Sequence, residues 1–155
     1  MRLGTYFSLA ELTRSPTARA MGIKNDPPPE VVERLRRLVE HVLDPLRESL
    51  KRPLVVNSAY RAPGLNERVG GASNSQHVLG EAADIECPGL STAALAARIV
   101  ELELPFDQLI LEHHEPEFPS SGWVHVSHRA SGVQRGQTLR AYRQGPRTVY
   151  VPWKP

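Results

Sequence analysis

An α+β domain, in which N-terminal helices pack on a small and mostly antiparallel sheet, is the architecture that this sequence favours. Apolar residues recur at helical spacing before residue 50, whereas short runs rich in β-branched residues dominate the chain after it. Helices that come early and strands that come late indicate an α+β arrangement rather than alternating βαβ units. The length of 155 residues is close to that of one average domain, so we expect a single domain over residues 1–155.

The N-terminal third predicts three helices. Ser8 stands three residues before a glutamate, the spacing of a capping box, and Ser15 precedes a proline that favours the first turn of a second helix ending at Gly22. From residue 31 to residue 50, apolar side chains recur every three or four positions, which predicts an amphipathic helix. Pro45 lies inside this pattern, and we expect it to kink the helix because proline has no N–H to donate.

The rest of the chain predicts short strands, loops and one further helix. Residues 62–76 are rich in Gly, Ser and Asn and predict a long polar loop. An Ala- and Leu-rich stretch over residues 92–102 predicts a helix. Runs with β-branched residues predict strands at residues 54–58, 82–85, 108–112 and 123–127 and an edge strand at residues 148–151.

Composition argues against several classes of protein. The chain carries 19 Lys+Arg and 17 Asp+Glu, a net charge of +2, which is too balanced for a protein that coats nucleic acid non-specifically. No apolar run reaches the roughly 18 residues of a membrane span, so we expect no stable membrane insertion. Cys87 is the only cysteine, which excludes an internal disulfide and a zinc site built from several thiolates. The N-terminus lacks the apolar core of a signal peptide, so we expect synthesis in the cytoplasm.

His77, Asp84 and His125 are the candidate metal ligands. Gly80 permits a turn between His77 and the strand that carries Asp84, and this turn would bring the two side chains together. His125 alternates with valines along its strand, so its side chain lies on the opposite face from theirs. Two imidazoles and one carboxylate form an open arrangement that catalytic zinc uses. Spacing alone leaves open that both histidines are hydrogen-bonded structural residues.

Several short motifs occur between residues 7 and 127 in a specific order. They lie at residues 7–12, 57–61, 69–71, 74–84, 106–110 and 122–127. Together they resemble the zinc D-Ala-D-Ala carboxypeptidase and peptidoglycan endopeptidase family, peptidase family M15, and specifically its phage-associated branch. The resemblance covers about four-fifths of the chain, and several motifs in order are more specific than any one of them.

The resemblance implies one zinc ion per chain, with His77, Asp84 and His125 as its ligands. It also assigns substrate binding to Arg61, because the family places an arginine in this turn. A guanidinium binds a carboxylate through two parallel hydrogen bonds, so Arg61 would hold an acidic group of a peptide. Ser75 would add a hydrogen bond at the same site.

The general base is the point at which the sequence departs from many relatives. They carry a glutamate three residues before the last zinc histidine, where this chain has Gly122. Glu112 ends a predicted strand, on the face away from its buried leucines, and looks like the glutamate that follows the same strand in the phage-associated branch. We therefore predict that Glu112 is the base. Glu115 and Glu117, in the loop that follows, are the alternatives.

The remaining histidines and Cys87 carry weaker expectations. His41 lies off the apolar stripe of its helix, and the pair at residues 113–114 is expected in a surface loop. His128 follows the strand of His125, and we weigh a place in the site against a surface position. Cys87 is expected to be a small packed residue rather than a nucleophile.

The function implied by the resemblance is that of a zinc metallopeptidase that hydrolyses an amide bond in bacterial peptidoglycan peptides, as a D-Ala-D-Ala carboxypeptidase or endopeptidase of the lysis type. We expect a phage or prophage enzyme that acts on the cell wall, with no separate wall-binding domain and no nucleic-acid partner. The rival hypothesis is a non-catalytic, zinc-containing module that binds the cell wall or a protein partner. A nucleic-acid-binding domain has only the arginine-rich C-terminal tail in its favour.

Overall fold

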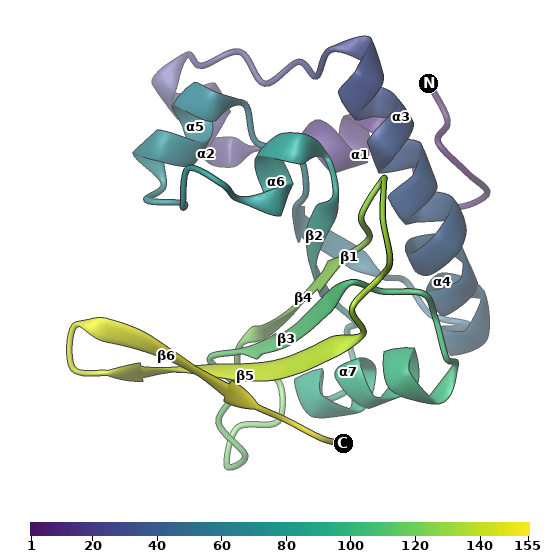
Figure 1. Cartoon of the computed structure of the whole chain (residues 1–155), viewed down its shortest axis with the longest axis vertical. Coiled ribbons are helices and arrows are strands. Elements are labelled where there is room, and N and C mark those ends of the chain that lie inside the picture. Colours follow the sequence, from purple (N-terminus) through teal and green to yellow (C-terminus); the bar gives the residue numbers. More distant parts are fainter.

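The sheet that carries the candidate residues has six strands in the order β1-β2-β4-β3-β5-β6 (Figure 1). A computed structural model describes all of residues 1–155. Neighbouring strands are antiparallel except β3 and β5, which run parallel. The strands are β1 Val55–Ser58, β2 Ala82–Glu86, β3 Gln108–Glu112, β4 Trp123–Ser127, β5 Gln137–Gln144 and β6 Arg147–Pro152.

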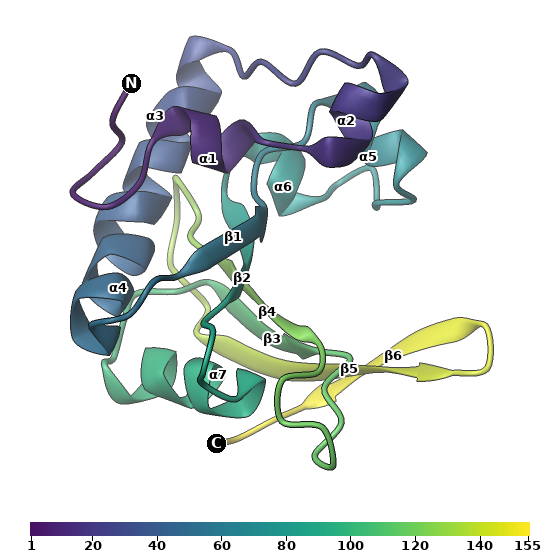
Figure 2. The ribbon, with the colours of Figure 1, turned by 180° about the vertical axis from the view of Figure 1, so that it is seen from behind.

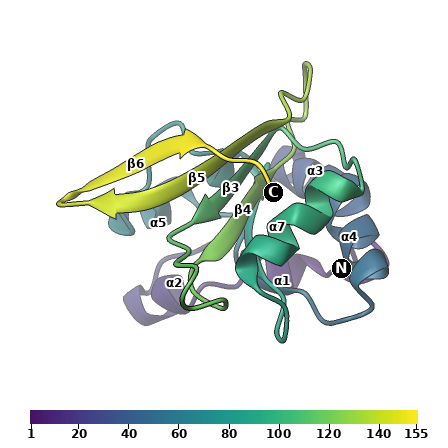
Figure 3. The same cartoon turned by 90° about the horizontal axis from the view of Figure 1, so that it is seen from below.

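Helices cover one face of this sheet and border the other. The run from α3 to α4 and helix α7 lie against one face, whereas α5 and α6 stand beside the opposite face (Figures 2 and 3). None of the helices has the length and apolar character needed to cross a membrane. The helices are α1 Leu9–Thr13, α2 Pro16–Met21, α3 Pro29–Leu38, the π-helical segment η1 Val39–Leu43, α4 Asp44–Leu50, α5 Pro63–Arg68, α6 Gln76–Leu79 and α7 Thr92–Glu101.

The two faces of the sheet differ in chemistry. Toward the helices, side chains such as Ile85, Leu109 and Val124 are fully buried and belong to one apolar cluster of 26 residues. Side chains alternate along a strand, so Asp84 and His125, which lie opposite each other in the β2–β4 pair, point to the other face. The apolar core thus fixes which face receives the polar side chains.

The long amphipathic helix predicted over residues 31–50 is present as the run α3–η1–α4. It continues through Pro45 because the turn before this proline widens to a π-helix, in which the N–H of Asp44 donates to the carbonyl of Val39. A proline cannot donate the next hydrogen bond of the ladder, and the wider turn accommodates that gap. Asp44 also accepts hydrogen bonds from the backbone N–H groups of Thr5 (2.6 Å) and Tyr6 (3.1 Å), so this turn anchors the N-terminal segment.

The predicted α+β fold with a mostly antiparallel sheet is confirmed. The strands predicted at residues 108–112 and 123–127 have the bounds of β3 and β4, and the predicted edge strand is part of β6. The two short N-terminal helices begin after Ser8 and Ser15, whose side chains accept hydrogen bonds from backbone N–H groups of the first turns.

Two parts of the fold differ from the sequence prediction. Residues 62–76, predicted as a loop, contain helix α5, which begins at Pro63 and buries Leu65. Gly and Asn have low helix propensity, so the sequence of this short helix does not predict a helix. Burial of Leu65 stabilises the helix instead. Strand β5 was not predicted, because its sequence is polar and only Ala141 is buried within it. Its pairing with β3 and β6 holds it in place.

Gly80 yields a test of how the turn before β2 is held. Its φ is +75°, and a Cβ at this position would lie 2.7 Å from Val31 Cγ1 and 2.9 Å from the Val31 carbonyl oxygen. We expect Gly80→Ala to lower the free energy of unfolding by about 2–4 kcal/mol, since strain of the left-handed backbone adds to overpacking.

Two other glycines serve as matched controls in chemical denaturation. Gly22 has a positive φ but open space around it, so Gly22→Ala isolates the backbone strain of about 1 kcal/mol. Gly64 has neither constraint, and Gly64→Ala should be neutral or slightly stabilising. If Gly80→Ala costs no more than Gly22→Ala, the close packing of the turn on α3 is refuted.

Candidate active site

A cleft of about 900 Å³ lies on the polar face of the sheet. Side chains of β2, β3 and β4 form its floor, and α6 with the segment before it forms one wall. Residues that follow β4 form much of the other wall. His77, Asp84 and His125 all line this cleft, so the three candidate ligands share one solvent-connected space.

Each of these three side chains is placed by a different element. Asp84 on β2 lies directly opposite His125 on β4 in an antiparallel pair, which puts both on the same face. His77 lies on helix α6, whose first turn is capped by the Ser75 side chain. Gly80 ends α6 in the left-handed conformation and turns the chain into β2. The turn predicted at Gly80 is therefore present and brings His77 to Asp84.

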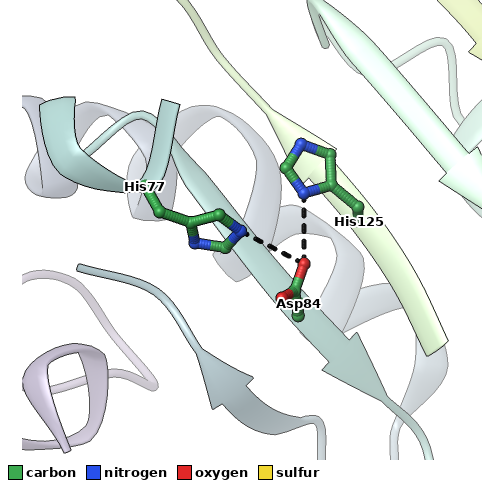
Figure 4. A group of neighbouring side chains, drawn as sticks. All are labelled: His77, Asp84 and His125. Atoms are coloured by element: carbon green, nitrogen blue, oxygen red, sulfur yellow. Dashed lines mark hydrogen bonds and ion pairs between the residues drawn. The ribbon is translucent and has the colours of Figure 1, made fainter. Parts of the chain in front are cut away.

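The three side chains converge on one oxygen atom (Figure 4). Asp84 Oδ1 lies 3.3 Å from His77 Nε2 and 3.1 Å from His125 Nδ1. One ligand atom from each of the three residues lies within 4.8 Å of the others. His77 is buried and His125 is half-buried, so both imidazoles are largely shielded from water.

The hydrogen bonds around His77 show that the cluster fits a cation. His77 Nδ1 lies 2.7 Å from the carbonyl oxygen of Ala59, an acceptor, so the neutral ring carries its proton on Nδ1 and leaves a lone pair on Nε2. That lone pair faces the carboxylate of Asp84, which is also an acceptor. Two acceptors at this distance require either a proton or a metal cation between them. The chemistry of the set, two imidazoles and a carboxylate, suits zinc.

Asp84 is held as a charged carboxylate by its neighbours. Burial disfavours the charge, but His77 and His125 outweigh it and hold the pKa of Asp84 well below its usual range. Arg61 contacts the second oxygen, with Nη2 3.3 Å from Oδ2, and its Nε donates to Ser58 Oγ at 3.1 Å. Asp84 Oδ1 thus faces the imidazoles while Oδ2 is bound by Arg61, an orientation typical of outer-shell support in metal sites.

Glu112 reaches the same cleft from the end of β3. Alternation along β3 buries Leu109 and Leu111 in the core and leaves Ile110 and Glu112 lining the cleft, as predicted. Burial raises the pKa of Glu112, and the Asp84 charge adds to this effect while His125 opposes it. A carboxylate with a raised pKa beside a candidate metal site has the properties of a general base.

The two alternative bases lie elsewhere. Glu115 and Glu117 are exposed in the loop after β3, and neither lines the cleft. Gly122, which stands where many relatives carry a glutamate, has a φ of +72°. A Cβ there would collide with the carbonyl oxygen of Glu112. The backbone around Gly122 therefore excludes a side chain at that position, and of the three glutamates considered as the base only Glu112 lines the cleft.

Asp107 is a functional candidate that sequence reasoning missed. It is fully buried, and Gln76, the neighbour of His77, donates to its Oδ2 at 3.1 Å. Arg135 donates from Nη2 to Oδ2 at 2.8 Å and from its backbone N–H to Oδ1 at 3.0 Å. Burial acts to raise the pKa of Asp107, but the bonds from Arg135 and Gln76 lower it overall. Asp107 thereby connects helix α6 to the segment after β4. Its position in the motif at residues 106–110 is the sequence feature that could have identified it.

The remaining candidates lie outside the cluster. His128 does not line the cleft; its ring stacks on that of His41, and its Nδ1 contacts the Pro105 carbonyl oxygen at 2.7 Å. It follows the last residue of β4 and faces the helix layer, so its place in the site is excluded. Cys87 is buried and burial raises the pKa of its thiol, which agrees with a packed residue.

Comparison with known proteins shows which family this chain resembles. A sequence model described as Peptidase M15 matches residues 5–127, a span that contains all three converging residues. The chain belongs to the peptidase M15 family. In addition, 45 residues of this chain are 44% identical to the zinc D-Ala-D-Ala carboxypeptidase of Streptomyces albus G. The match spans 29% of this chain and 18% of that relative. The family expected from the motifs is confirmed, and its phage-associated branch stays a prediction.

The convergence of three ligand atoms predicts metal binding that can be measured directly. We expect close to one zinc per chain by elemental analysis and loss of that zinc in His77→Ala and His125→Ala, with most secondary structure retained. His41→Ala, which changes a histidine outside the cluster, is the matched control. Zinc content should fall as the pH drops below about 6, because protons compete for the imidazoles. Full zinc content in both variants would refute the assignment.

Proposed function

We propose that this chain is a zinc-dependent peptidase that hydrolyses an amide bond in bacterial peptidoglycan peptides. The observation that carries the proposal is the convergence of His77, Asp84 and His125 in a cleft that also contains the carboxylate of Glu112. Membership of the M15 family and the local similarity to a zinc D-Ala-D-Ala carboxypeptidase support it. Carboxypeptidase and endopeptidase action both remain candidates within this proposal.

The two imidazoles and Asp84 would hold the zinc ion. When bound, zinc supplies a Lewis acid that polarises the scissile carbonyl and acidifies the attacking water. Glu112 accepts the proton that water loses and returns it to the nitrogen of the leaving amine. Amide hydrolysis needs both transfers, and burial raises the pKa of Glu112, which makes its carboxylate a better proton acceptor.

Arg61 has two roles in this proposal. Its contacts with Asp84 Oδ2 and Ser58 Oγ use part of the guanidinium, which has five N–H donors. Arg61 lines the cleft, and its remaining donors would hold a substrate carboxylate. Ser75, whose hydroxyl accepts from the His77 backbone N–H, acts by fixing the helix that carries a ligand.

The proposal is tested with purified peptidoglycan and defined stem peptides, assayed with zinc and with chelator. Zinc-dependent release of a new amine, with products identified by mass spectrometry, supports it and names the bond. Zinc binding without hydrolysis of any of these substrates would instead favour the non-catalytic binding module, for which the glycine at residue 122 is the supporting observation. A role in phage lysis stays a prediction made from the sequence.

Glu112 provides the sharpest test of the mechanism. Glu112→Gln preserves the shape of the side chain but removes its basic oxygen, so we expect zinc to remain bound while turnover falls by about 10²–10⁴-fold. The measurement pairs kcat with zinc content for the same protein preparation. Glu115→Gln and Glu117→Gln, in the exposed loop, are the controls and should retain near-wild-type kcat. An essential acid in that loop together with an active Glu112→Gln variant would overturn the assignment.

A further inference from the structure

The cleft has a direction that is set by strand β3. Gln108, Ile110 and Glu112 all line it, so it follows this strand over its whole length. His125 lies opposite Ile110 in the β3–β4 pair, which places the candidate metal centre near the middle. One end of the cleft contains Glu112, and the other end continues past Gln108 toward the residues after β4. A substrate seated at the metal therefore extends along the sheet in two directions.

The far end of the cleft is built by a part of the chain that the family match does not include. The match ends at residue 127, and the residues after it that line this end are Arg129, Ser131 and Arg135. Two later residues line other parts of the cleft: Leu139 lies beside Ile110, and Tyr150 lies toward the Glu112 end. The segment between β4 and β5 rises beside α3 (Figure 1), where Arg37 Nη1 donates to the Ala130 carbonyl oxygen at 3.1 Å. This wall thus lies outside the segment that the family model matches, and loops placed around a site on a rigid scaffold commonly carry binding residues.

Four arginines line the cleft, and two of them have no acidic partner. Arg61 pairs with Asp84 and Arg135 pairs with Asp107. The guanidinium groups of Arg34 on α3 and Arg129 after β4 make neither an ion pair nor a hydrogen bond within the chain, although Arg34 is half-buried. Arg129 is exposed. Guanidinium groups that line a cleft and have no acidic partner are well suited to an anionic ligand.

The backbone that carries Arg129 is held in place. Its N–H donates to Gln134 Oε1 at 2.8 Å, and Gln134 Nε2 donates back to its carbonyl oxygen at 2.8 Å. The next N–H, of Ala130, donates at 3.1 Å to Oε1 of Glu81, a further carboxylate that lines the cleft. The wall is therefore ordered before any ligand arrives, and a rigid wall loses less entropy on binding.

We propose that Arg34 and Arg129 form a carboxylate-binding subsite that holds an acidic group of the substrate away from the scissile bond. Arg129 follows His125 by four residues, so the Cα atoms of these two residues lie within about 13 Å of each other. That distance corresponds to about three or four residues of extended peptide. This inference rests on the proposed function and adds a substrate preference to it. The preferred substrate is an acidic stem peptide whose free carboxylate lies several bonds from the amide that is cut.

The test uses two synthetic peptidoglycan stem pentapeptides that differ only at the α-carboxyl group of the D-glutamyl residue, free in one and amidated in the other. We expect the wild-type, zinc-loaded chain to prefer the free acid by about tenfold in kcat/KM. The double variant Arg34→Gln, Arg129→Gln should reduce that ratio to about one, through a loss of kcat/KM on the free acid. Arg143→Gln, which removes one exposed charge of β5 outside the cleft, should keep the wild-type ratio.

Two results would overturn the subsite: no preference by the wild-type chain, or the same preference in the double variant. If no peptide is hydrolysed, the proposed function fails, and the subsite is then judged by binding alone. Calorimetric titration of both peptides into the wild-type chain and the double variant decides it. Tighter binding of the free acid that is lost in the double variant supports the subsite, and equal dissociation constants refute it.

Discussion

The charge of Asp84 is the feature around which the rest of the site is arranged. A carboxylate that is nearly withdrawn from water is costly unless cations or donors face each of its oxygens. Here two imidazoles reach one oxygen and Arg61 reaches the other. Each partner comes from a different element, so β4, α6 and the turn after β1 must all be in place before the charge is compensated. The cluster is therefore a product of the tertiary structure rather than of a local motif.

Burial of the opposite face of the sheet is what keeps those elements in place. Asp84 alternates with Ala83 and Ile85, both fully buried, and His125 alternates with Val124 and Val126, which are buried as well. A shift of one residue in the pairing of β2 with β4 would move the polar side chains into the core and the apolar ones into the cleft. The hydrophobic effect thus fixes the register, and the register fixes the geometry of the candidate ligands.

Local sequence patterns explain why much of the fold could be predicted from the sequence. The alternation along the strand of His125, and the glycine between His77 and β2, are short-range patterns that constrain the backbone directly, so these strands and the turn were predicted. The same patterns left a structural role for both histidines open, and the resemblance to the family singled out His77, Asp84 and His125 as candidate ligands. The strand alternation that turned Glu112 to the cleft is of the same kind. Residues 137–144 carry no such pattern, and only long-range pairing makes them a strand. The free guanidinium of Arg129 is likewise visible only once its neighbours are known.

Asp107 links the two parts of the cleft that the family match separates. Through Gln76 it restrains the helix that carries His77, and through Arg135 it fixes the wall that follows β4. Since its carboxylate is fully buried, neither contact can be lost without leaving a charge or a donor partly uncompensated. A change in this wall that removes Arg135 would therefore disturb the candidate metal site, whereas a change at Arg129, whose guanidinium makes no hydrogen bond or ion pair within the chain, would not. Arg135 is therefore needed to hold the site together, whereas Arg129 can change without loss of a contact that supports it.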